Sequence, residues 1–340
     1  HISTILLLLP NIISIDLYSL EFKTKISCIL PSSLIVDTKF SIIDFNFGLF
    51  VRLTVETELF RNALNKILSV VDKKNSRPIL AYCLISAKED QLELSATDLE
   101  VSAKVILDAK VENPGNFCVN AKTLFEILRE LPQSFLTLTT SDDKTSLNIT
   151  CDDIHYSLLI YRTDDFPHLS FGSGVNEFII NSENLLDIIS KTSHAISNDE
   201  TRLYMNGLYL QEVESKLRAV ATDGHRLSLL ETELNQDNNG LLINGIIIPR
   251  KGVFEIKRAA ESYPDKQLKI SVDESFIFIN AEDKYLLSIR LIAREYPKYQ
   301  AVIPAKTSFA LRADRDAFFN AVRRIKIMSN EKSNGVRVTI

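Results

Sequence analysis

The sequence has few of the residues and motifs from which metal, redox and catalytic sites are built. Its 340 residues include only four cysteines, and no two of these form a CxxC pair, so neither a zinc knuckle nor a disulfide framework is indicated. The five histidines have no metal-ligand spacing. There is no P-loop, no GxGxxG fingerprint and no paired-carboxylate motif. The sequence therefore predicts a protein without a catalytic site, a metal or a cofactor.

One short stretch contains the residue types of a hydrolase triad. Asp223, His225 and Ser228 are close neighbours in the chain. Residues two and three apart on a strand, a turn and a strand do not converge as an acid, a base and a nucleophile, and no GxSxG elbow is present. We therefore reject the interpretation as an enzyme.

A large excess of one charge is also missing. The 39 basic and 44 acidic side chains give a net charge of −5, which argues against a uniformly basic nucleic-acid binder but leaves a locally basic surface open. The composition is that of a globular protein with two or three domains. The apolar run Ile5–Leu9 is too short to cross a bilayer and follows no basic segment, so we expect no signal peptide and a cytoplasmic location.

The first fifty residues differ in composition from the rest. They contain no alanine and no arginine, and they are rich in isoleucine, leucine, phenylalanine and serine. We interpret residues 1–50 as lying outside the evolved domains, as translated upstream sequence would. A genuine N-terminal extension remains the alternative.

From Val51 onward, one pattern occurs five times. Each copy is a short apolar strand, a polar cap and an amphipathic helix, with apolar residues at i, i+3 or i+4, and i+7. The copies start roughly 64 residues apart, and a near-constant period indicates internal duplication. They occupy residues 53–68, 117–131, 178–192, 246–260 and 309–325.

The segments between these copies alternate apolar and polar residues. Residues 92–107, 136–151 and 217–234 are typical of antiparallel strands, and Asp223-Gly224 supplies the positive φ that a tight hairpin needs. Strands and helices therefore alternate in an α+β arrangement.

A longer period connects pairs of copies. The ATD triplet at 96–98 recurs at 221–223, and DFP at 165–167 is matched by EYP at 295–297. Two copies therefore form one domain, and linkers are expected at the proline segments. The predicted organisation is an extension at 1–50, domain 1 at 51–172, domain 2 at 173–303, and the first part of a third domain at 304–340.

Four motifs in this order resemble one family. They are ATDGHRL at 221–227, PRKGV at 249–253, YPKY at 296–299, and SNEK followed by GVR within 329–337. The chain resembles the bacterial DNA polymerase III beta subunit, the sliding clamp of the replicative polymerase. The resemblance implies a DNA clamp fold of tandem two-helix domains, with antiparallel sheets outside and helices lining a ring. Residues 1–50 have no counterpart in the family pattern, and the last part of the family's third domain is absent from this sequence.

That resemblance also implies a function. A processivity factor of this kind encircles duplex DNA as a head-to-tail homodimer and binds short peptide motifs of polymerases and the clamp loader, without catalysis. Consistent with contact to phosphates, basic residues exceed acidic ones by two in 249–261 and by three in 312–327. The alternative is a truncated clamp-like fragment that cannot form a ring.

The resemblance carries DNA contacts over to basic and aromatic positions. In this sequence they are Lys74, Arg77, Arg202, Tyr204, Arg250 and Lys251. The alternative is that the cations are ordinary loop charges and that Tyr204 covers a domain edge.

The family's apolar peptide groove maps to a second set of positions. These are Met205, Thr222, Gly224, His225, Arg226, Leu227, Pro297 and Val302. The alternative is that the Asp-Gly pair serves turn geometry and that Thr222 and Leu227 belong to a core.

The family's dimer contact maps to apolar positions of the first and third domains. Ile127, Tyr156 and Leu158 would form one side, and Ile327 and Met328 the other. The alternative for Ile127 is that its side chain faces the core of its own domain.

Overall fold

The computed structural model describes residues 50–71, 77–172, 177–199, 201–234, 242–306, 310–328 and 336–338, and the structural statements below refer to these. All of them belong to one compact unit, Gly48–Ile340. We keep the predicted bounds as names, so that domain 1 is residues 51–172 and domain 2 is residues 173–303. The predicted extension lies outside the described residues except for Phe50.

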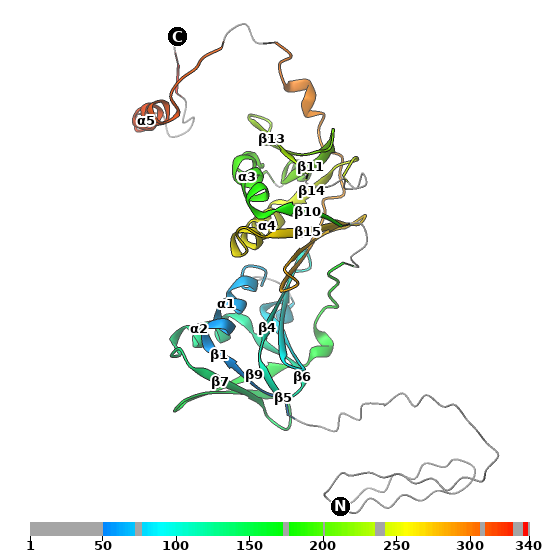
Figure 1. Cartoon of the computed structure of the whole chain (residues 1–340), viewed down its shortest axis with the longest axis vertical. Helices are drawn as coiled ribbons and strands as arrows, with labels where there is room; N and C mark the ends of the chain where they lie inside the picture. Colours follow the sequence, from blue (N-terminus) through cyan, green and yellow to red (C-terminus); the bar gives the residue numbers. More distant parts are fainter. Residues whose placement is uncertain are drawn as a thin grey trace, which may run out of the picture. The chain divides into compact units, whose positions relative to one another are not determined.

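Domain 1 is built from two strand and helix repeats (Figure 1). Its elements are β1 (Arg52–Glu56), α1 (Thr57–Ile67), β2 (Tyr82–Lys88), β3 (Gln91–Thr97), β4 (Val101–Asp108), β5 (Lys110–Asn113), β6 (Gly115–Asn120), α2 (Ala121–Glu130), β7 (Phe135–Thr140), β8 (Ser146–Cys151) and β9 (Ile154–Tyr161).

Domain 2 repeats this order, although its described residues include no counterpart of β5. Its elements are β10 (Glu177–Asn181), α3 (Ser182–Thr192), β11 (Gly207–Val213), β12 (Lys216–Thr222), β13 (Leu227–Glu233), β14 (Ile246–Pro249), α4 (Arg250–Ser262), β15 (Gln267–Val272), β16 (Phe276–Ala281) and β17 (Tyr285–Arg290). A fifth helix, α5 (Arg315–Lys326), follows.

All five segments predicted to contain a helix do so, and the local causes are visible. The Asn120 side chain accepts a hydrogen bond from the Thr123 amide at 3.0 Å and so caps α2. Asp314 caps α5 in the same way through Ala317, at 2.8 Å. The three predicted strand segments form the hairpins β3–β4, β7–β8 and β12–β13.

The sheets of the two domains are continuous at one place. The order β4-β3-β2-β6-β9-β8-β7-β1-β5 forms the sheet of domain 1, and β10-β15-β16-β17 of domain 2 extends it. The connection is an antiparallel ladder between β17 and β4, from Tyr285 opposite Val105 to Ile289 opposite Val101. A separate sheet of domain 2 has the order β13-β12-β11-β14.

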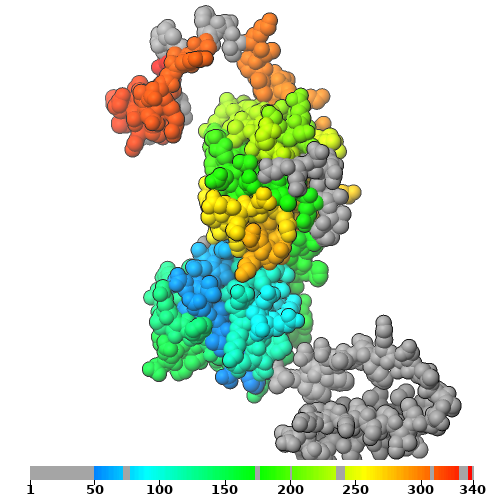
Figure 2. All heavy atoms as spheres, viewed as in Figure 1, coloured from blue at the N-terminus to red at the C-terminus, as the bar shows by residue number. Residues whose placement is uncertain are grey.

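The helices pack in pairs against the strands. Helix α1 contacts α2, and α3 contacts α4 (Figure 1). The apolar stripes predicted from the periodicity are buried: Phe60 and Leu124 in domain 1 and Ile188 in domain 2 are fully inaccessible. Buried apolar side chains of both domains form one core cluster. Figure 2 shows the outer surface of the same elements with all heavy atoms drawn. None of the described helices is long and apolar enough to cross a bilayer.

Candidate DNA, peptide and subunit interfaces

The two domains meet through polar contacts as well as through the β17–β4 ladder. The Ser69 hydroxyl, just after α1, donates to the Glu255 carboxylate of α4 at 2.8 Å. Arg258 of α4 donates to the Asn65 carbonyl of α1 at 3.0 Å. Because α1 also contacts α2, and α4 contacts α3, the four helices form one continuous layer. We call this set of contacts the interdomain joint.

Lys251 lies in the interdomain joint. Its ammonium group forms an ion pair with Asp98 of domain 1 and donates to the Val70 carbonyl at 3.4 Å. The Asp98 side chain is only 9% exposed, so the pair is shielded from solvent screening. The structure therefore gives Lys251 a role in holding the domains together, and its DNA contact stays a prediction.

Glu255 is the most deeply buried charged group of the joint, with 3% exposure. Burial raises the pKa of its carboxyl, while the hydrogen bond from Ser69 and the charge of Arg258 oppose that rise. Sequence reasoning missed this residue because a glutamate inside a basic helix gives no signal of burial.

Two further predicted DNA contacts, Arg250 and Arg202, lie at the start of α4 and in the loop that it contacts. The Arg250 backbone amide donates to the Asn206 carbonyl at 3.0 Å, and its guanidinium contacts Asn198 and lies 5.8 Å from the Phe254 ring centroid. Arg202, in the same loop as Asn198, pairs with Asp199 at 3.2 Å.

Tyr204 and Arg77 have different surroundings. The Tyr204 ring packs against a small aromatic cluster of domain 2, as a residue covering a domain edge would. Arg77 is exposed at the start of a 3₁₀ turn in domain 1. Lys74 lies outside the described residues.

The β12–β13 turn is fixed by Asp223. Its carboxylate accepts hydrogen bonds from the amides of His225 and Arg226 at 2.9 and 3.0 Å, and it pairs with the Arg226 guanidinium at 2.9 Å. Although partial burial works against ionisation, these bonds hold the pKa of Asp223 below its usual range. Gly224 has φ +87°, which confirms the predicted turn.

The same contacts rule out the hydrolase triad. The Asp223 carboxylate is occupied by the turn amides and by Arg226, and the Ser228 hydroxyl donates to the Lys191 carbonyl at 2.7 Å. Among the described residues, no cluster of His, Cys, Asp and Glu side chains is arranged to hold a metal ion.

Several predicted peptide-groove residues gather beside this turn. Thr222 is buried and donates to the Arg226 carbonyl at 2.8 Å, while Leu227 is half-buried in the aromatic cluster. A methyl group on Gly224 would lie 3.3 Å from the Arg202 guanidinium, so the loop that contains Met205 borders the turn. Val302 is 70% exposed.

The chain that follows β17 lies across the second sheet of domain 2. The Tyr296 hydroxyl donates to the Val220 carbonyl at 3.3 Å, and its ring stacks on Tyr209 with centroids 4.6 Å apart. Arg218 donates to the Tyr299 hydroxyl at 3.2 Å. These contacts fix Pro297, which lies between the two tyrosines in the chain.

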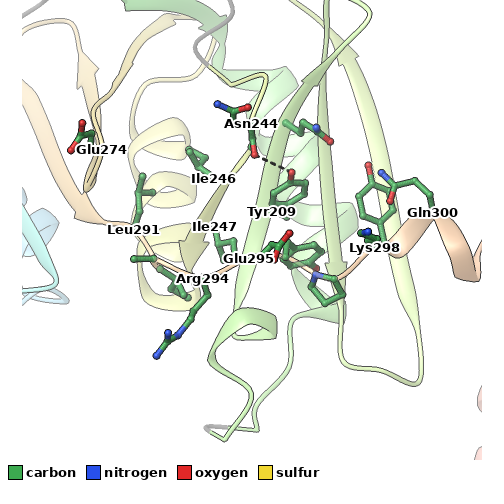
Figure 3. A pocket seen from close by; sticks show the side chains of 17 residues that line it. Tyr209, Asn244, Ile246, Ile247, Glu274, Leu291, Arg294, Glu295, Lys298 and Gln300 are labelled. Atoms are coloured by element: carbon green, nitrogen blue, oxygen red, sulfur yellow. Dashed lines mark hydrogen bonds between the residues drawn. The ribbon is translucent and has the colours of Figure 1, made fainter.

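A pocket of about 400 Å³ lies between this segment and strands β11 and β14 (Figure 3). Of the predicted groove residues it contains only Pro297. The Tyr209 side chain points into it, with its hydroxyl donating to the Asn244 carbonyl at 3.4 Å. Sequence reasoning missed this pocket, since Tyr209 is far from Tyr296 and Tyr299 in the chain.

The predicted subunit residues lie on exposed parts of β9 and α2 and after α5. Tyr156 is 40% exposed, and Ile127 and Leu158 are half-buried against the main core. Ile127 therefore packs partly against its own domain, as the alternative had it. Ile327 and Met328 are more than four-fifths exposed. The SNEK motif lies outside the described residues.

Strand β9 has an open edge in the described structure. It pairs with β8 from Ile154 to Leu159, but it pairs with β6 only at Ile160 and Tyr161. The backbone groups of its first six residues on the other side face no strand among the described ones.

The fold is that of the DNA sliding clamps, as comparison with solved structures shows. The Caulobacter crescentus beta sliding clamp has a TM-score of 0.78 at 34% identity and covers 84% of this chain and 77% of its own. A sliding clamp of Bartonella birtlesii, solved with griselimycin bound, has a TM-score of 0.78 at 32% identity, with 84% and 76% covered. The predicted α+β clamp fold is confirmed.

The chain belongs to the DNA polymerase III beta subunit family. Residues 51–170 match the family's N-terminal domain and residues 179–298 its central domain. The beta sliding clamp of Caulobacter vibrioides is 36% identical over 299 residues, which cover 85% of this chain and 78% of that protein. That of Rickettsia felis is 32% identical over 293 residues, with 85% and 76% covered. The resemblance seen in the motifs is thereby confirmed.

Proposed function

We propose that this chain is a non-catalytic processivity factor that closes into a ring as a head-to-tail homodimer around duplex DNA. The ring would keep the replicative polymerase on its template by topological linkage. Contacts to DNA would be made to phosphates, because base-specific hydrogen bonds would create stopping points along the duplex. We place it in the cytoplasm, on the nucleoid.

The comparison of β9 with β17 carries this proposal. The two strands hold the same position in their domains, since each is the last strand and pairs with the preceding one from its first residue. In β17, which pairs with β4 along its other edge, Leu287 and Ile289 are fully buried in the main core. Their counterparts in β9, Tyr156 and Leu158, remain partly exposed beside an open edge. An open strand edge is a site for pairing with another chain. The interdomain joint is therefore a template for the subunit contact.

The helices support the same contact. Lys251 and Glu255 of α4 face domain 1 in the interdomain joint, whereas Lys122 and Glu126 occupy the same positions of α2 and form an exposed pair at 3.7 Å. We propose that this face of α2, with Ile127, meets the neighbouring subunit.

The other side of that contact would be the end of α5. When α5 is aligned with α1 from their N-caps, Ile327 and Met328 take the places of Ser69 and Val70. Those two residues contact Glu255 and Lys251 in the interdomain joint. The proposed subunit contact therefore repeats the joint, with isoleucine in place of the serine and methionine in place of the valine.

For DNA, we propose that the helix layer faces the duplex. Arg250 at the start of α4 and Arg202 in the adjoining loop offer guanidinium groups suited to phosphates. We rank Lys251 below them because its partner Asp98 is buried in the interdomain joint, whereas the ion pair of Arg202 with Asp199 is exposed to solvent.

For partners, we propose that peptide motifs of polymerases and the clamp loader bind beside the β12–β13 turn. Leu227 and Met205 supply apolar surface there, and the fixed Asp223 turn provides a rigid wall. An aliphatic or aromatic anchor would lose its water in such a site. Val302, which is exposed, is available to cover the bound anchor.

Light scattering coupled to size exclusion tests the ring. The proposal expects twice the mass of one chain, and it expects the protein to stay on nicked circular DNA after loading and to leave when that DNA is cut. A monomer that is never retained on circular DNA would contradict the ring and favour a clamp-like chain that does not encircle DNA. Binding of polymerase peptides by such a monomer would still support the peptide site.

A further inference from the structure

A shallow apolar groove of about 500 Å³ lies on domain 1, where β1, β7 and the start of α1 meet near β5. Val55 forms its floor and is 2% exposed. Leu59 and Phe135 stand at its sides with 49% and 69% of their surface exposed. Large apolar side chains grouped in this way on a surface mark a site of interaction more often than isolated ones do.

Domain 2 shows that the fold does not need these apolar residues. Phe135 pairs with Glu56 across β7 and β1, and Gln267 pairs with Asn181 across β15 and β10 at the same place in the repeat. Leu59 is the third residue of α1, where α3 has Asn184. The same backbone therefore carries polar side chains in one domain and apolar ones in the other.

The groove also lies apart from the contacts between domains. The interdomain joint uses β4, β17, α4 and the end of α1, whereas Leu59 is at the start of α1 and Phe135 begins β7. The proposed subunit contact uses β9 and α2. Neither of these contacts covers the groove.

Acidic side chains surround the apolar surface. Glu56 and Asp90 have no ion-pair partner among the described residues, and Asp108 lies 3.9 Å from Lys284. Among the described residues that line the groove, Lys110 is the one basic residue. The rim therefore has an excess of negative charge, which favours a basic ligand and disfavours an acidic one.

We propose that this groove docks a short segment of a partner protein in which one or two large apolar residues are flanked by lysine or arginine. The apolar anchor would cover Leu59 and Phe135, and the basic flanks would face Glu56 and Asp90. This surface is separate from the peptide site beside the β12–β13 turn.

Fluorescence anisotropy with a labelled peptide tests the proposal on the full chain. The probe is an octapeptide with a central Leu-Phe pair between three basic residues on each side, and its control replaces every basic residue by glutamate. We expect the basic probe to bind, the acidic control to bind at least tenfold more weakly, and the affinity to fall with added salt.

Variants that copy domain 2 locate the site. Phe135→Gln and Leu59→Asn introduce residues that the repeat already tolerates, so both should fold, which thermal melting checks. Each is expected to weaken binding of the basic probe at least fivefold, and Glu56→Gln with Asp90→Asn should weaken both the affinity and its salt dependence. Ile243→Asn, which replaces an exposed apolar residue elsewhere, is the matched control and should change nothing.

Three outcomes would overturn the proposal. They are no binding of the basic probe to the unaltered chain, equal binding by Phe135→Gln, and equal binding of the acidic control. Light scattering tests whether the groove instead binds a second copy of the chain. If Phe135→Gln changes the oligomeric state and leaves probe binding unchanged, the groove contacts a second copy and the proposed partner is wrong.

Discussion

Domains 1 and 2 are two copies of one fold that differ in what their surfaces meet. In domain 1, β6 and β9 pair at two positions and unite all the strands in a single sheet. In domain 2, the corresponding strands β14 and β17 belong to different sheets, and one backbone hydrogen bond of 2.9 Å, from Ile292 to Ile247, takes the place of that ladder. The repeat therefore keeps the same elements in both domains, but the pairing of its last strand with the strand before its second helix differs between them.

The clearest difference concerns one glutamate. Glu126 in α2 and Glu255 in α4 occupy the same helical position, yet the side chain of the first is 56% exposed and the second residue is buried at 3%. The cause is the neighbour, since α4 packs against domain 1 and the corresponding face of α2 has no neighbour among the described residues. Residues at equivalent positions of the repeat thus contribute differently to stability because their contacts differ.

Removing a core side chain from either domain should have the largest effect. Phe60→Ala and Leu185→Ala are each expected to lower the free energy of unfolding by about 2–5 kcal/mol, because both side chains are fully buried. Calorimetry checks this prediction. If the interdomain joint couples the domains, each variant should shift one common transition, whereas two separate transitions would show that they unfold independently.

The open edge of β9 offers the next largest effect. Leu158→Asp should weaken the proposed homodimer roughly 100-fold, because it places a charge in a contact that is apolar on the counterpart strand β17. Analytical ultracentrifugation measures the dissociation constant. His155→Asp, on the opposite face of the same strand, is the control for added charge, and an equal loss in both variants would argue against a specific role of Leu158.

The glutamate pair gives a direct comparison of the two helices. Glu255→Ala should cost about 1–3 kcal/mol, because it removes the acceptor of the Ser69 hydroxyl inside the interdomain joint. Glu126→Ala should cost less than about 1 kcal/mol, as exposed pairs contribute little. Denaturant unfolding of both variants checks this, and equal costs would contradict the assigned difference in burial.

The raised pKa of Glu255 adds a pH dependence with a defined sign. Between the usual glutamate pKa of about 4.3 and the raised folded-state value, the unfolded chain loses its proton first, so stability falls as pH rises. Glu255→Gln does not titrate and should lose this slope. Its stability relative to the unaltered chain should therefore improve as pH rises through that window, which unfolding curves at several pH values measure. A difference that stays constant with pH would contradict the prediction.

The smallest effect is expected for single DNA contacts. Arg250→Ala should weaken binding to duplex DNA a few-fold, equally for all sequences, and should lower the salt slope by about one. Arg52→Ala, an exposed arginine in β1 of domain 1 that lies outside the helix layer and the proposed subunit contact, is the comparison and should leave the slope unchanged. Titrations at several salt concentrations distinguish them, and an unchanged slope for Arg250→Ala would remove it from the DNA surface.

Much of the fold followed from local patterns. The spacing of Leu124 and Leu128 predicted the buried stripe of α2, and Asp223-Gly224 predicted the hairpin turn, because both depend on residues close in the chain. The candidate sites were harder to predict from the sequence. The placement of Lys251 against Asp98 and the grouping of Tyr209, Tyr296 and Tyr299 depend on segments far apart in sequence.

The sequence by itself determined the repeat, the helix and strand order, the family and the absence of the usual catalytic motifs. Periodicity and turn chemistry are local, and a duplicated pattern is visible without coordinates. Only the tertiary structure decided which copies of the pattern are buried and which are exposed. Glu255 and Glu126, or Leu287 and Tyr156, hold equal places in the repeat, but the first of each pair is buried and the second is exposed, because burial depends on the neighbour that each surface meets.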